Sequence, residues 1–139
     1  MNFTQAEAEI RKFFKDGWVA AGNDADVIAW PDVKFTIPEG ESWVRFTCAE
    51  NDGAQVSMGN PGANRFRHYG IVTIQVFQPQ DQGSKEARQL ATDALGVFMG
   101  AQTTNGVIFY NVLGRQIGND GAGFYQINVL ASFYYDEIT

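Results

Sequence analysis

The feature that most constrains the fold is the stretch Arg65–Pro79, a long run of strand-forming residues in a chain of 139 residues. β-Branched residues are dense from Ile71 onward, and Pro79 marks the end because it cannot donate to a sheet ladder. A straight strand of this length would measure roughly 46 Å, whereas a compact domain of this size is roughly 37 Å across. The strand therefore either bends at Gly70 or extends past the domain. We interpret it as a central strand whose first part forms an arm.

Two segments have the apolar spacing of amphipathic helices. Thr4 and Glu7 match a capping box, and the first helix is predicted to run to about Ala21 with Gly22 as its stop. The second helix is predicted between an N-cap at Ser84 and a stop at Gly100.

The remaining periodic segments alternate with period two and predict strands. Glu50–Gly53 reads as a turn, and an Asp-Gly pair near Asn119–Gly121 favours a hairpin. The expected strands are Ser42–Ala49, Ala54–Met58, Val107–Leu113 and Phe124–Tyr135. The sequence thus predicts one α+β domain over residues 1–139. It has a largely antiparallel or mixed sheet, two amphipathic helices on one face, and a protruding hairpin or arm.

Charge and cysteine content exclude several classes of protein. The formal net charge of −6 argues against a protein that grips nucleic acid, but it permits a surface that DNA passes without sticking. The single cysteine, Cys48, cannot form an internal disulfide, which fits a reducing interior. No signal peptide or apolar run long enough to cross a bilayer is evident, so we expect a soluble intracellular protein and no membrane partner.

The chemistry of a catalytic centre is not apparent in the sequence. His68 is the only histidine and has no carboxylate beside it in sequence, which favours a structural role. The segment Gly83-Ser84-Lys85 lacks the order of residues in a phosphate-binding loop, and no serine lies in a nucleophile-elbow setting. We therefore expect no enzymatic activity, no cofactor, no metal and no catalytic residue.

The order of landmarks along the chain resembles the tail-terminator proteins of bacteriophages with long, non-contractile tails. After the N-terminal helix come the segments Ile28–Pro31, Trp43–Phe46, Gly59–Gly62, Arg65–Phe77, Tyr125–Val129 and Phe133–Glu137. The resemblance implies a structural virion protein that forms a six-membered ring on the tail tube, stops tube polymerisation and presents a joining surface to the head-side connector or head-completion protein. It also implies a location at the head-proximal end of the tail, after assembly in the host cytoplasm, with double-stranded DNA passing through the lumen without specific binding.

Candidate surfaces follow from this resemblance and from charge. By position, the resemblance implies a subunit or tube interface at Trp43, Arg45, Arg65, Arg67, Tyr69 and Gly70. A ring needs two different side surfaces, which the basic arm and an acidic region over Asp24–Asp52 could supply, although both could equally be solvated faces. Glu50 and Asp52 are the expected lumen-facing residues, because a DNA exit path should be neutral or acidic.

Two other classes of protein stay open at this point. Another virion part, such as a tube or head-completion subunit, would share the acidity and the lack of catalytic residues. A small-ligand-binding α+β domain would need a pocket with converging polar groups.

Overall fold

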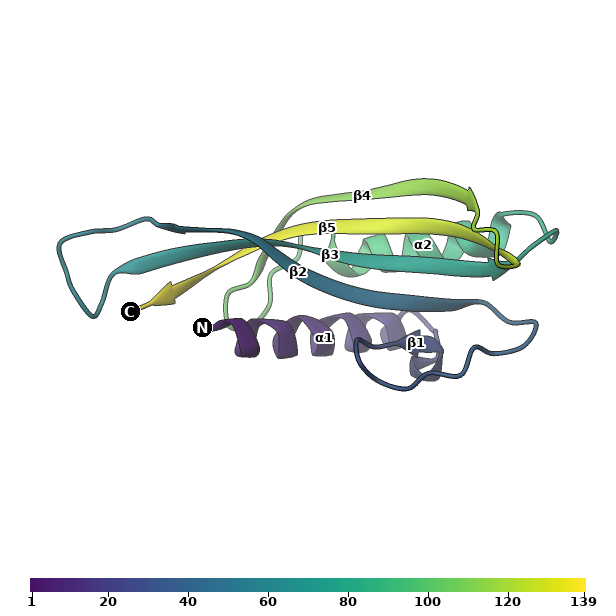
Figure 1. Ribbon diagram of the computed structural model, residues 1–139, viewed down its shortest axis with the longest axis horizontal. Coiled ribbons are helices and arrows are strands. Elements are labelled where there is room, and N and C mark those ends of the chain that lie inside the picture. Colours follow the sequence, from purple (N-terminus) through teal and green to yellow (C-terminus); the bar gives the residue numbers. More distant parts are fainter.

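The structure is a computed structural model that describes residues 1–139, and its centre is one five-stranded sheet (Figure 1). The strands lie in the order β1-β2-β3-β5-β4, with β1 parallel to β2 and all other neighbours antiparallel. The elements are α1 (Phe3–Ala20), the short 3-10 helix η1 (Ala25–Val27), β1 (Ile28–Ala29), β2 (Trp43–Gln55), β3 (Arg65–Pro79), α2 (Lys85–Phe98), β4 (Ile108–Asn119) and β5 (Phe124–Ile138). The predicted α+β class is confirmed.

The long strand has the predicted bounds and lies at the centre of the sheet. β3 pairs with β2 on one side from Trp43 to Gln55. On its other side it pairs with β5 along all fifteen residues, from Arg65 opposite Ile138 to Pro79 opposite Phe124. β2 and β5 therefore pair directly with β3, and β4 joins the sheet through β5.

The predicted turn at Glu50–Gly53 is wrong, because β2 continues through it to Gln55. The register shifts by one residue between Glu50 and Asp52, so Asn51 is the extra residue of a β-bulge. Ala54 consequently continues β2 and does not begin a separate strand. The polar residues that resemble a turn in sequence lie on an exposed strand, where a bulge accommodates them.

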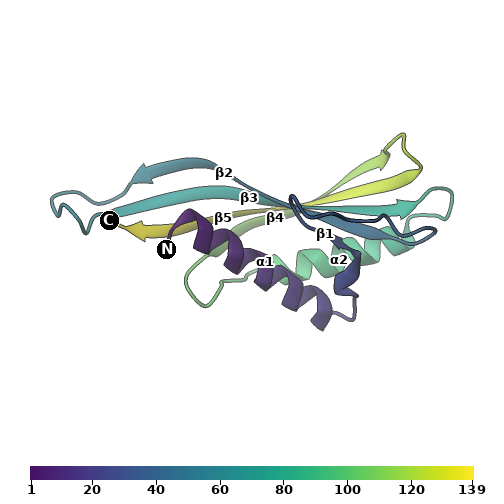
Figure 2. The same cartoon turned by 60° about the horizontal axis from the view of Figure 1, so that its bottom comes forward.

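Both helices pack on the same face of the sheet, as predicted (Figure 2). The capping box of α1 differs from the expected one: Asn2 is the N-cap, its side chain accepts from the Gln5 amide at 2.9 Å, and the Gln5 side chain accepts from the Asn2 amide at 3.0 Å. The Asn-x-x-Gln spacing is chemically equivalent to the Thr-x-x-Glu spacing two residues later, so sequence alone did not separate them. None of the helices is both long and apolar enough to span a membrane.

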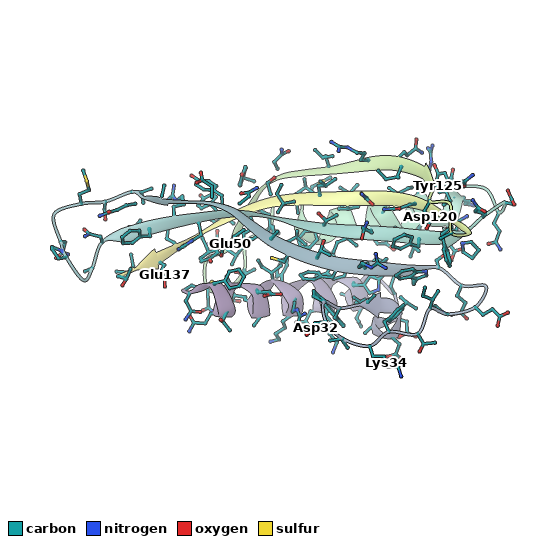
Figure 3. The ribbon with its side chains drawn as sticks, in the orientation of Figure 1. Asp32, Lys34, Glu50, Asp120, Tyr125 and Glu137 are labelled. Carbon is teal, nitrogen blue, oxygen red and sulfur yellow. The ribbon has the colours of Figure 1, made fainter.

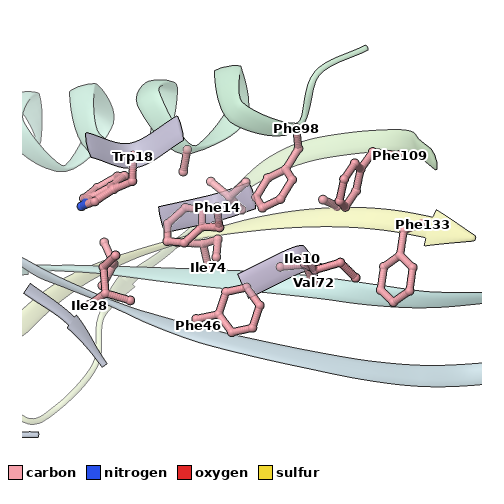
Figure 4. Close-up of a cluster of buried hydrophobic side chains, with 14 of the residues drawn as sticks. Ile10, Phe14, Trp18, Ile28, Phe46, Val72, Ile74, Phe98, Phe109 and Phe133 are labelled. Atoms are coloured by element: carbon pink, nitrogen blue, oxygen red, sulfur yellow. The ribbon is translucent and has the colours of Figure 1, made fainter. Parts of the chain in front are cut away.

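Aromatic rings fill the space between the helices and the sheet (Figure 4). Phe14 of α1 lies at the centre, fully buried, with its ring stacked on Phe98 of α2 at 5.8 Å and 5.9 Å from Phe46 of β2. Burial of each such side chain contributes roughly 1.5–3 kcal/mol. This cluster makes the two helices and the sheet one packed unit.

The last strand has the two different faces that its sequence predicts. Alternate residues from Ile127 to Tyr135 are buried beneath the helices, while the residues between them are only partly covered. β4 runs to Asn119 and β5 to Ile138, so both are longer than predicted. The opposite side of the sheet, which we call the helix-free face, is thus left largely uncovered.

Candidate functional site

The feature that distinguishes the shape is an arm formed by the hairpin between β2 and β3 together with the end of β5 (Figures 1 and 2). It extends beyond the N-terminal end of α1, and the loop over residues 56–64 closes its tip. Met58 in this loop is 85% exposed. The C-terminus is tied to the base of the loop, where Asn64 and Thr139 exchange two backbone hydrogen bonds of 2.9 Å.

The arginines of the arm are held by a carboxylate of β5 on the helix-free face. Arg67 donates to both oxygens of Asp136 at 2.8 and 3.1 Å, and Arg65 donates to one of them at 2.9 Å. Hydrogen bonds from Arg67, and then from Arg65, lower the pKa of the Asp136 carboxyl, and the same contact raises the pKa of the Arg67 guanidinium. The arm is therefore less basic than its sequence suggests. Arg65 keeps a half-exposed side chain, and the expected interface role of both arginines stays a prediction.

On the opposite face of the arm, His68 lies between the carboxylates of Glu50 and Glu137. Figure 3 labels these two acidic residues. The Nδ1 of His68 is 3.5 Å from Glu50 and its Nε2 is 3.1 Å from Glu137, while its ring stacks on Tyr135 at 5.0 Å. The Tyr135 hydroxyl donates to Glu50, and burial followed by this hydrogen bond raises the pKa of the tyrosine. Sequence reasoning missed these partners because they come from β2 and β5, and only the strand register brings them together.

The members of this polar cluster lie on three neighbouring strands and contact one another. His68, Glu50, Glu137 and Tyr135 do not line any of the main hollows of the surface. No group of three or more His, Cys, Asp or Glu side chains is arranged to hold a metal ion. The cluster connects β2, β3 and β5 at the base of the arm, where the core beneath the helices ends at Tyr135.

The two residues expected to face a lumen lie on opposite sides of the sheet. Glu50 is opposite Gly70 and points to the helix side, where it contacts His68 and Tyr135. Asp52 is opposite Tyr69, which lies on the helix-free face, and it is exposed. The bulge at Asn51 separates them, since an extra residue reverses the alternation of faces. Their role in a lumen stays a prediction.

Trp43 and Arg45, the first pair of the expected interface, differ in accessibility. Trp43 is only 3% exposed, because Phe35 from the loop after β1 packs on one side and Phe77 stacks on it at 4.2 Å. Arg45 is exposed and places its guanidinium over the rings of Trp43 and Phe77, at 5.3 and 5.5 Å from their centroids. Of these two, Arg45 is the residue that a partner could reach.

Tyr69 and Gly70, the other expected interface residues, also lie differently. Tyr69 is on the helix-free face in a cluster with Tyr110 and Tyr134, with ring centroids 5.9 to 6.4 Å apart. Gly70 is buried, and a Cβ at this position would lie 2.5 Å from the carbonyl oxygen of Ala49. The structure therefore gives Gly70 a packing role inside the chain, while the tyrosines are available at the surface.

Comparison with known proteins identifies the family. Two solved structures have the same fold: a protein without a descriptive name aligns with a TM-score of 0.64 and 22% identity over 100% of this chain and 96% of that chain. A chain of the virion of a native gene transfer agent particle aligns with a TM-score of 0.52 and 15% identity over 86% and 84% of the two chains. No curated protein matches the sequence. The family model described as phage tail terminator protein matches residues 10–130. Because this model matches most of the chain, from within α1 to within β5, the chain belongs to the phage tail terminator family.

Proposed function

We propose that this protein is a non-enzymatic, structural subunit that closes the end of a phage tail tube as a ring of six copies. In this role it stops tube polymerisation and provides the surface that joins the head-side connector or head-completion protein. It would act at the head-proximal end of the virion tail, after assembly in the host cytoplasm. The membership of the tail terminator family supports this proposal, and the observation that carries the ring is the pair of free sheet edges.

The two edges of the sheet are suited to pair with each other between copies. β1 covers β2 only at Val44 and Arg45, so the rest of β2 has no neighbour on its outer side. β4 forms the other edge and is free after a short contact between Gln102 and Ile108. Because each step from β2 to β4 is antiparallel, these two edges run in opposite directions. A β2 edge can therefore pair antiparallel with the β4 edge of the next copy in a head-to-tail ring.

The dimensions of the sheet support a ring with an open centre. Six copies of four long strands, spaced at about 4.8 Å, would close a circle about 37 Å across before strand tilt widens it. A helix layer about 10 Å thick on the inside would fill most of this opening. We therefore place the helices outward and the helix-free face inward, where it lines the path of the DNA.

The arm supplies a contact along the ring axis. It continues the direction of β2 and β3 past the helices, so in such a ring it would project toward the neighbouring layer of the tail (Figure 1). Its exposed Met58, with Arg65 next to the tip loop and Tyr69 further along β3, gives the proposed contact with the tail tube protein an apolar tip and polar sides. In this proposal the edges of the sheet close the ring, and the arm binds the tube.

Cross-linking between the two edges tests the proposal. In a Cys48→Ala background, Thr47→Cys on β2 and Leu113→Cys on β4 place one thiol near each edge on the helix-free face. A flexible bis-maleimide should then give a ladder of bands that ends at six copies. The matched control carries only Thr47→Cys and should stop at dimers, because a head-to-tail contact needs both edges.

Electron microscopy of tail tubes mixed with the protein provides the second readout. We expect one capping layer at the tube end and no further growth of the tube. Long tubes formed by the protein alone would indicate a tube subunit instead, and a persistent monomer with no association to tubes would oppose the proposal.

A further inference from the structure

The central part of the helix-free face is basic, although the chain as a whole is acidic. The chain carries sixteen acidic residues and a net charge of −6. The strand register places three successive rows of side chains on the central part of this face. The rows are Arg45, Gln75, Asn128 and Arg115; then Thr47, Thr73, Leu130 and Leu113; then Ala49, Ile71, Ser132 and Asn111. None of these twelve residues is acidic, and two are arginines.

The first of these rows presents two free guanidinium groups separated by two amides. Arg45 and Arg115 are exposed, and no carboxylate oxygen lies within 4.0 Å of either guanidinium. The rings of Trp43 and Phe77 support Arg45 from below. The Asn128 side chain accepts a hydrogen bond of 2.7 Å from Gln126, which orients its amide.

The arginines of the arm provide an internal comparison. Arg65 and Arg67 lie on the same face but share Asp136, which accepts one hydrogen bond from Arg65 and two from Arg67 and offsets part of their charge. Arg45 and Arg115 have no such partner, so their donors stay available to an external anion. A planar guanidinium with free donors binds phosphate oxygens with favourable geometry.

We propose that the row formed by Arg45, Gln75, Asn128 and Arg115 contacts the phosphate backbone of double-stranded DNA. The inference rests on the ring proposed above, in which the helix-free face is turned inward. Each copy contributes two guanidinium groups, and the ring places them as a belt around the DNA. In this ring the expected lumen residue Glu50 faces the helices, whereas Asp52 lies on the inner face but in the arm, outside the belt.

The belt has only two cationic side chains per copy, which fits transient contact with DNA that moves through the ring. The neighbouring rows hold hydroxyl, amide and aliphatic side chains, with no lysine among them. Each phosphate contact contributes about 0.9 to the slope of log K against log salt concentration. A belt with two cations per copy, on a protein of net charge −6, therefore holds DNA at low salt and releases it as salt rises.

Fluorescence anisotropy with a short linear DNA duplex tests the inference over a salt series. The double variant Arg45→Gln with Arg115→Gln should lose the salt-dependent association, with the slope falling by about 0.9 for each contact removed. The matched control Lys15→Gln with Arg88→Gln makes the same change in net charge on the helices and should retain it. Arg45→Lys with Arg115→Lys keeps the charge and should also retain most of it.

Mass photometry on the same samples separates this inference from the proposed ring. Rings that form in all variants, with DNA association lost only in the Arg45/Arg115 glutamine variant, would support the belt. Rings with unchanged DNA association in that variant would overturn the belt and leave the ring standing. Equal loss in the helix control would also overturn it, as would binding of polyglutamate in preference to DNA. If the unmodified protein forms no rings either free in solution or on tail tubes, the proposed function itself is rejected.

Discussion

Substitution of Gly70 by alanine tests whether the base of the arm is packed as tightly as the structure indicates. Gly70 is buried in β3, opposite Glu50 of β2 and Phe133 of β5. An added Cβ would lie 2.5 Å from the Ala49 carbonyl oxygen and 2.5 Å from the nearest ring carbon of Phe133. Neither neighbour can move easily, because the first is backbone inside a paired strand and the second is a ring packed in the core.

The expected cost follows from two opposing effects. Overpacking of a filled site typically costs about 1–3 kcal/mol, and a clash with backbone places Gly70→Ala at the upper end of that range. Loss of chain entropy in the unfolded state returns about 0.4–1 kcal/mol. We expect a net destabilisation of about 2 kcal/mol, which corresponds to a fall in Tm of roughly 6–10 °C for a chain of this length.

Thermal and urea unfolding followed by circular dichroism measure this effect. Gly114→Ala is the matched control, since Gly114 also lies in a strand and its added Cβ would be 3.7 Å from Leu95, an ordinary contact. Its stability should be unchanged or slightly higher. A Gly70→Ala protein as stable as the unmodified one would refute the close approach of β2, β3 and β5 at this point.

Two further predictions concern titratable groups. Asp136→Asn should lower stability at neutral pH by about 1 kcal/mol, since the cluster is partly exposed and water screens it. Because folding lowers the pKa of Asp136, its stabilisation is present above the ordinary carboxyl pKa of about 4 and is lost as pH falls through the lower value, so urea unfolding curves of the two proteins should converge in acid. Burial, with Glu7 and Glu50 nearby, raises the pKa of Cys48 to about 12. Iodoacetamide at pH 8 should therefore label the folded thiol on the order of a thousandfold more slowly than the thiol in urea, and equal rates would contradict the burial.

The central strand was predictable because several independent features of its sequence indicate the same structure. Its β-branched residues, its alternation and its terminal proline all favour one long strand with the bounds Arg65–Pro79, and the structure has the same bounds. The excess of its length over a compact domain indicated an arm, and the hairpin does extend beyond the helices. The face of β5 that packs on the helices was predictable for the same reason, since apolar residues recur there at every second position.

The bulge and the ion pairs of the arm were not predictable from local sequence. Glu50–Gly53 has the composition of a turn, and only the pairing of β2 with β3 on both sides of Asn51 shows that the strand continues. Likewise, Asp136 is sixty-nine residues from Arg67 in the chain, and the register of β5 against β3 alone brings them together. Charges counted along the sequence therefore overestimated how basic the arm is.

The polar contacts along the arm explain how a segment beyond the helices keeps one orientation. On the helix-free face Asp136 binds Arg67 and Arg65, and on the other face His68 lies between Glu50 and Glu137. β3 is thus held from both sides by polar contacts in the region where apolar packing ends. An arm ordered before assembly loses less conformational entropy on binding than a flexible one. In the proposed role at the end of a tail tube, the arm would then meet its partner in a single geometry, and the contact would depend on position rather than on local rearrangement.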